Sequence, residues 1–183
     1  MPRLFIAISL PDDLKMMLTH LRADIPGATW VKPPAMHLTL RFLGDQVEAA
    51  RVPTLKMALA GLRAAPFDLT LQGVGRFPPN TRKPARVLWV GLAAQPALHA
   101  LYRSIEQAVV GLGFPPDDHD FSAHITLARL KSDRVVREVD DFLAAHQSFS
   151  APPFAVSQFT LYASTLSPQG PTYTPEAVFP LDG

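Results

Sequence analysis

The chain contains the stretch HLTLRF at residues 37–42 and a second copy, HITLAR, at residues 124–129. Each copy alternates polar and apolar residues over its first four positions, which is typical of a β-strand with one buried face. Side chains two positions apart on a strand point to the same side. We therefore predict that the histidine and the threonine of each copy lie side by side on the open face of their strand.

The same order of elements surrounds both copies. Pro11 and Pro96 each begin a pattern of apolar residues at helical spacing ahead of the motif. A phenylalanine, Phe67 or Phe154, then follows the motif histidine by 30 residues in each half (67 − 37 and 154 − 124). Matching order and spacing indicate an internally duplicated chain, with approximate repeats 1–85 and 86–183 in one bilobal domain spanning 1–183.

Apolar periodicity predicts the remaining elements and an α+β fold class. The expected architecture is two lobes related by a pseudo-twofold axis, with a central cleft between them. Each lobe has an antiparallel sheet with helices on its outer face. Helices are expected from 11 to about 25, over 52–63, from 96 to about 112 and over 135–146. Strands are expected over 4–10, 36–42, 67–71, 87–90, 121–127, 154–156, 158–165 and 177–181.

Composition excludes several classes of protein. The 183 residues are 48% hydrophobic and 18% charged, which is typical of a globular chain and not of a disordered one. The absence of cysteine excludes disulfides and thiolate sites, and a net charge of +1 excludes a strongly basic coat for nucleic acid. No apolar run reaches the ~20 residues of a membrane span, and no signal peptide is evident, so a cytoplasmic location is expected.

Two imidazoles facing each other across a cleft favour acid–base chemistry on a phosphodiester. In-line displacement at phosphorus needs a base on the nucleophile, an acid on the leaving oxygen and donors to the other oxygens. An imidazole with its pKa of ~6.5 can serve as either acid or base near neutrality. We predict His37 and His124 as the catalytic pair and the hydroxyls of Thr39 and Thr126 as phosphate ligands.

Two arginines are candidates for the same phosphate. Arg129 closely follows the second motif, and Arg41 has the same strand parity as His37 and Thr39. A basic group formed by Arg76, Arg82, Lys83 and Arg86 is either a guide for an RNA strand or an ordinary solvated loop.

Other residues have weaker claims. His119 lies between acidic neighbours, but a solvated loop fits this segment better than a metal site, so no metal is predicted. Phe5 and Phe42 are candidates for stacking on a base. Parity assigns Phe42 to the core unless its strand is bulged.

The chain resembles the two-histidine phosphoesterase superfamily, and in particular the bacterial and archaeal RNA 2′,3′-cyclic phosphodiesterases, once described as 2′-5′ RNA ligases. The resemblance spans nearly the whole chain and includes RLFIAI at 3–8, HLTLRFLG at 37–44, RVLWVGL at 86–92 and HITLAR at 124–129. It implies hydrolysis of RNA or nucleoside 2′,3′-cyclic phosphates to 2′-phosphomonoesters, with no metal and no cofactor. By analogy, His37 is the proton donor and His124 the proton acceptor, an order that the two motifs alone do not settle.

Two alternatives stay open. The first is reversible 2′-5′ joining of tRNA halves without ATP, since a 5′-hydroxyl can replace water. The second is a non-catalytic nucleotide- or RNA-binding module, against which the two intact histidines argue. A monomer is expected, because no exposed apolar helix demands a partner.

Overall fold

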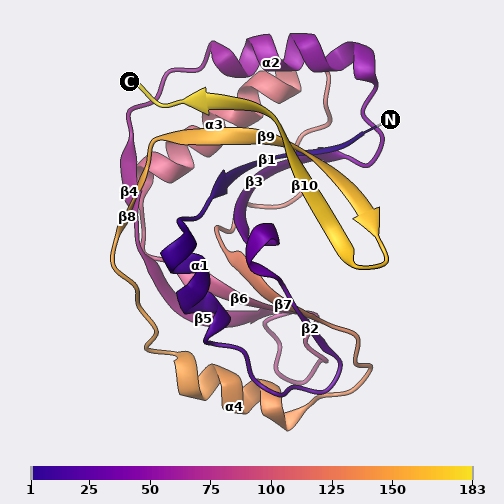
Figure 1. Ribbon diagram of the computed structural model, residues 1–183, viewed down its shortest axis with the longest axis vertical. Helices are drawn as coiled ribbons and strands as arrows, with labels where there is room; N and C mark the ends of the chain where they lie inside the picture. Colours follow the sequence, from indigo (N-terminus) through magenta and orange to yellow (C-terminus); the bar gives the residue numbers. More distant parts are fainter. Residues whose placement is uncertain (1, 183) are drawn as a thin grey trace.

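A computed structural model describes residues 2–182 (Figure 1). The chain forms a large antiparallel sheet with the strand order β10-β9-β1-β3-β7-β6-β5, with β2 beside β7, and a small sheet of β4 and β8. The strands are β1 (Arg3–Ser9), β2 (Ala28–Trp30), β3 (His37–Gly44), β4 (Phe67–Leu69), β5 (Leu71–Phe77), β6 (Val87–Leu92), β7 (Ile125–Leu130), β8 (Phe154–Val156), β9 (Gln158–Ser167) and β10 (Gly170–Pro180). The helices are α1 (Asp12–Thr19), α2 (Val52–Ala60), α3 (Pro96–Gly111) and α4 (Arg137–His146), with 3₁₀ helices η1 (Pro33–Ala35) and η2 (Ala49–Arg51).

The α+β class and the two antiparallel sheets agree with the sequence prediction, but the sheets are divided differently. The arm β9-β1-β3 and the arm β7-β6-β5 form one continuous sheet, joined where Leu38 pairs with Ile125. Each of these residues directly follows its motif histidine, so the junction pairs equivalent positions. The two motifs therefore meet at the centre of the large sheet.

The small sheet shows the same symmetry. Its central pair is Asp68 with Ala155, the residues that directly follow Phe67 and Phe154. The arms of the large sheet are related in a similar way: β9 from the second half pairs with β1, and β5 from the first half pairs with β6. Each arm thus contains strands from both halves of the sequence. The division into repeats 1–85 and 86–183 stays an inference from the sequence.

Helices cover the outside of the sheet at its two ends. Figure 1 shows α2 and α3 together at one end and α4 at the other, and α3 contacts β3 while α4 contacts β5. The inner face of α3 consists of residues spaced three and four apart: Leu98, Leu101, Ile105 and Val109, all buried. Replacing one such leucine by alanine typically costs about 2–5 kcal/mol.

Several boundaries differ from the sequence prediction. Helix α1 ends at Thr19, so Ile25 is buried outside it, and α2 and α4 are shorter than expected. Strand β7 begins at Ile125, which leaves the predicted strand residues 121–124 in an irregular segment. Strand β10 begins at Gly170, well before residue 177. The short strand β2 was not predicted.

Most of strand β5 was also missed, because two of its seven residues are glycines, which strands disfavour. Gly75 has a packing reason. A Cβ at this position would lie 2.1 Å from the indole of Trp89, so only glycine fits.

Within residues 2–182, no helix combines the length and apolar character needed to cross a membrane.

Candidate active site

The two motif strands carry the same irregularity. On β3, Thr39 pairs with Ala7 and Arg41 with Ile6, so Leu40 has no partner of its own on β1. Such a bulge interrupts the alternation of side chains. Leu40 and Arg41 are consecutively buried as a result, and the strand returns to the face of Thr39 only at Phe42.

Strand β7 bulges at the equivalent place. Thr126 pairs with Trp89 and Ala128 with Leu88, which leaves Leu127 without its own partner. Leu127 and Ala128 are both buried, and Arg129 is exposed. The bulge therefore turns Arg129 to the face that carries Thr126.

That face forms the wall of a cavity of about 330 Å³. Both motifs contribute to the lining, together with the segment from β2 to η1 and the tip of the β9–β10 hairpin. The lining residues are Thr29, Trp30, Val31, Lys32, Ala35, His37, Thr39, His124, Thr126, Arg129, Lys131, Gln169, Gly170, Pro171 and Tyr173. Five of the six predicted site residues thus line one cavity.

His37 is half-buried and bonded at both ring nitrogens. Its Nδ1 lies 2.8 Å from the carbonyl oxygen of Ala35, and its Nε2 lies 2.8 Å from Oγ1 of Thr39. Because a carbonyl only accepts, Nδ1 carries a proton and Nε2 is the nitrogen available for chemistry. Phe5 and Tyr173 contact the ring, with centroids 4.9 and 5.1 Å from it.

His124 is held in the same manner. Its Nδ1 donates to the carbonyl oxygen of Ser122 at 2.7 Å, again two residues before the histidine. Phe77 meets the imidazole edge-on at 5.0 Å, and Trp89 lies 6.3 Å away. Both motifs therefore fix the same tautomer and leave Nε2 for acid–base work.

Burial and positive charge favour the neutral form of both rings. Burial lowers the pKa of His37 below its ordinary value of 6.5, and the charges of Arg129, His124 and Lys15 lower it further. Burial, with a smaller effect of Arg129, also lowers the pKa of His124. The bonds to Ala35 and Ser122 act in the opposite direction. A bound anion would offset the effect of the positive charge of Arg129 and so favour the protonated form of the neighbouring histidine ring.

Arg41 is the one predicted site residue outside the cavity lining. Because of the bulge, its side chain points to the core side, where Nε lies 2.5 Å from Oε2 of Glu106. Its guanidinium also donates to the carbonyls of Phe42 and Pro115. The assignment of Arg41 to the phosphate was wrong, since strand parity does not hold across a bulge.

The two aromatic candidates for base stacking also lie in different surroundings from those expected. Phe42 was assigned to the core on parity, but it is 41% exposed, and the guanidinium of Arg3 lies 5.0 Å from its ring. Phe5 is buried behind His37 and stacks on Tyr162. Its position suits support of the imidazole and not contact with a base.

The predicted basic group is partly internal. Arg76 is buried and donates to the carbonyls of Pro78, Asn80 and Lys83, so it shapes the loop and is not available to a ligand. Arg82, Lys83 and Arg86 are exposed.

The acidic loop around His119 shows no arrangement suited to a metal. Asp117 faces Tyr102 and Glu106, while His119 and Asp118 form an exposed pair 3.3 Å apart. No group of three or more metal-ligating side chains occurs among residues 2–182.

Sequence analysis missed the residues that close the cavity. Tyr173 and Gln169 come from the hairpin, and Lys32 and Lys131 add positive charge near the wall. None belongs to a motif, and no local pattern separates them from surface residues. The arrangement can transfer protons at two Nε2 atoms while Arg129 and the threonine hydroxyls bind an anion.

Known proteins of similar sequence and structure share one family. The sequence model of the 2′-5′ RNA ligase superfamily matches residues 10–166. An RNA 2′,3′-cyclic phosphodiesterase of Archaeoglobus fulgidus is 34% identical over 97% of this chain and 99% of its own length. One from Escherichia coli is 32% identical, over 94% of this chain and 93% of its own. The crystal structure of E. coli LigT complexed with 3′-AMP has a TM-score of 0.78 and 29% identity, with full coverage of both chains.

Proposed function

The chain belongs to the 2′-5′ RNA ligase superfamily, and we propose on this premise that it is an RNA 2′,3′-cyclic phosphodiesterase. Curated relatives that align over nearly all of this chain carry that name. The reaction opens the cyclic phosphate at an RNA end and leaves a 2′-phosphomonoester.

The paired histidines carry this proposal. In each motif Nδ1 donates to a backbone carbonyl, so Nε2 is the ring nitrogen that can exchange a proton with substrate. Both histidines line the cavity. Two imidazoles of the same tautomer, one in β3 and one directly before the neighbouring strand β7, suit an in-line reaction in which one proton is removed and another supplied. Simple binding of a nucleotide requires no such pair.

In the proposed reaction, Nε2 of His124 takes a proton from a water molecule as the water oxygen forms a bond to phosphorus. The bond from phosphorus to the 3′-oxygen breaks, and Nε2 of protonated His37 supplies the proton to that oxygen. The electron pair of the broken bond stays with the leaving oxygen, so atoms and charge balance. The next cycle begins after the proton returns from His124 to His37 through solvent.

The remaining cavity residues would stabilise the charge on phosphorus. Arg129 offers two N–H groups to the non-bridging oxygens, and Thr39 and Thr126 offer hydroxyls. Thr39 already contacts Nε2 of His37 at 2.8 Å, which would set the ring before substrate arrives. Loss of one such donor in other enzymes typically costs 10²–10³-fold in rate.

The direct test is incubation with the four nucleoside 2′,3′-cyclic phosphates and with a short RNA bearing a cyclic end, with 2′- and 3′-phosphate products resolved. We expect 2′-phosphates from the wild-type chain, the same rate in EDTA and a bell-shaped pH profile. Release of 3′-phosphates, or full activity of both His37→Ala and His124→Ala, would contradict the mechanism. Tight binding of nucleoside 2′-phosphates without turnover would instead favour a binding module.

The family name supports a second activity, the joining of RNA ends through a 2′-5′ bond. A 5′-hydroxyl would take the place of water and give its proton to His124. Because water is present at ~55 M, this route requires the second RNA end to be held in place. Joining of tRNA halves without ATP would establish it. A monomeric state and a cytoplasmic location stay predictions, which gel filtration and fractionation would check.

A further inference from the structure

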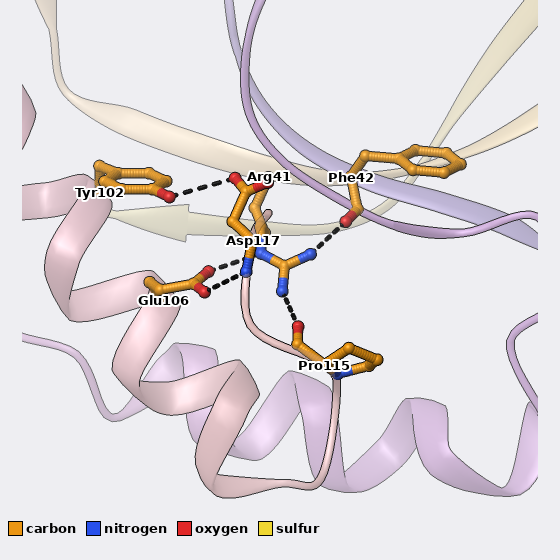
Figure 2. Close-up of polar contacts among 6 residues, drawn as sticks. All are labelled: Arg41, Phe42, Tyr102, Glu106, Pro115 and Asp117. Atoms are coloured by element: carbon orange, nitrogen blue, oxygen red, sulfur yellow. Dashed lines mark hydrogen bonds and ion pairs between the residues drawn. The ribbon is translucent and has the colours of Figure 1, made fainter. Parts of the chain in front are cut away.

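Arg41 forms the centre of a buried polar network on the core side of β3 (Figure 2). Its guanidinium donates to Oε2 of Glu106 at 2.5 Å, to the carbonyl of Phe42 at 2.6 Å and to the carbonyl of Pro115. The side chain is 8% exposed, so these contacts are largely shielded from water. The network joins the strand of the first motif to helix α3 and to the segment after it.

That segment, residues 112–124, leads directly to His124 and contains no helix or strand. The other carboxylate oxygen of Glu106 accepts the backbone N–H of Asp117 at 2.8 Å. Tyr102 donates to Asp117, and its ring stacks on Phe121 with centroids 4.3 Å apart. Burial and the bond to Asp117 raise the pKa of Tyr102 to about 12, so its hydroxyl remains a donor. These contacts hold the segment up to the residue before Ser122.

We propose that Arg41 is a positioning residue: from the strand that carries His37, it fixes the segment whose Ser122 carbonyl orients the imidazole of His124. The inference rests on the proposed function, since the orientation of His124 matters only if this ring transfers a proton. Arg41 itself touches no reacting atom.

The two histidines depend on different supports. The carbonyl that orients His37 belongs to Ala35 in η1, a 3₁₀ turn that begins with two prolines, whose φ angles are fixed. The carbonyl that orients His124 lies in irregular chain and has no such restriction. Loss of Arg41 should therefore release His124 and leave His37 in place.

Two variants separate positioning from folding. Arg41→Met leaves the partly buried carboxylate of Glu106 without its charged partner, and the loss of such a partner destabilises proteins in general. The double variant Arg41→Met/Glu106→Gln removes both charges and keeps an acceptor for the Asp117 amide. The double variant still lacks the bond to Pro115, so it tests positioning in a chain without the unpaired charge.

The readouts are kcat and KM for a cyclic nucleotide, and the tautomer of each histidine from NMR of the ring nitrogens at a pH where both are neutral. We expect kcat to fall about 10- to 100-fold with little change in KM. We also expect the Nδ1–H tautomer to stop being the predominant form of His124, while it stays the predominant form of His37. Arg41→Lys, which can reach fewer of the three acceptors, should restore part of both signals.

Arg51→Met is the matched control. Arg51 donates to the carbonyl of Leu112 at 2.9 Å and lies 3.9 Å from the ring of Phe114, so it holds the beginning of the same segment. Its loss should leave kcat and both tautomers unchanged. An unchanged His124 tautomer in the double variant, or an equal change in both histidines, would overturn the inference. The tautomers decide this even if the wild-type chain fails to hydrolyse any cyclic phosphate, an outcome that would contradict only the proposed function.

Discussion

Strands β3 and β7 begin alike and diverge after their bulges. The histidine and threonine of each motif line the cavity, with His124 directly before the first residue of β7, and each strand then buries two consecutive residues. The fourth position after the histidine is Arg41 in β3 and Ala128 in β7. The fifth, which the bulge returns to the open face, is Phe42 in β3 and Arg129 in β7.

This difference gives a nearly symmetric fold an asymmetric site. The guanidinium of Arg129 faces the cavity and lowers the pKa of both histidines, whereas that of Arg41 is turned inward to hold the chain before His124. A symmetric pair of imidazoles can thereby acquire separate roles, because their surroundings differ although their backbones match. Four predictions test how far the two strands are equivalent.

The largest effect is expected at the histidines. His37→Ala and His124→Ala should each lower kcat about 10²- to 10⁴-fold, because each removes one proton-transfer step. A cyclic substrate with sulfur in place of the leaving 3′-oxygen needs little protonation, so it should restore much of the rate to His37→Ala and not to His124→Ala. Equal rescue of both variants would show that the two strands do not divide the acid and base roles.

A smaller loss is expected at Arg129. Arg129→Met should lower kcat/KM on the order of 100-fold, and Arg129→Lys less, since lysine keeps the charge without the fork of donors. Removing the positive charge raises the pKa of both histidines, so the pH–rate profile should move to higher pH. Arg103→Met, an exposed change on α3, is the control. A profile that does not move would exclude Arg129 as a neighbour of the pair.

The third effect concerns stability against acid. Burial lowers the pKa of His37 below the 6.5 of an unfolded chain, so the unfolded state binds more protons as the pH falls through that range. The stability of the wild-type chain should therefore drop below about pH 6.5. His37→Asn should show a shallower drop in urea unfolding at a series of pH values, and exposed His119→Asn should not. An unchanged slope in His37→Asn would mean that this ring is not desolvated.

The smallest effect is expected at Phe42. Although it occupies the position equivalent to Arg129, it is 41% exposed and does not line the cavity. Phe42→Ala should change kcat/KM by less than about twofold and stability by less than about 1 kcal/mol. Phe5→Ala, which removes a buried ring against His37, should cost about 3–5 kcal/mol. A large loss of activity in Phe42→Ala would place this ring in contact with substrate.

Local sequence patterns were sufficient to predict the repeated motif and most of the helices and strands. Alternation identified the strands around His37, and helical spacing identified α3, because both signals depend on neighbours within a few residues. The motif residues line one cavity as the sequence predicted, since the step from histidine to threonine precedes the bulge.

Only the tertiary structure decided which arginine faces the cavity. Arg41 has the correct parity and points away, whereas Arg129 has the opposite parity and lines the wall. A bulge depends on how a strand pairs with its neighbour, here β1 or β6, and pairing between distant segments leaves no periodic signal in either of them. The positions of Lys32 and Tyr173 in the cavity wall also depend on long-range strand pairing. The sequence by itself therefore determined the two imidazoles, and the packing of distant strands determined what surrounds each of them.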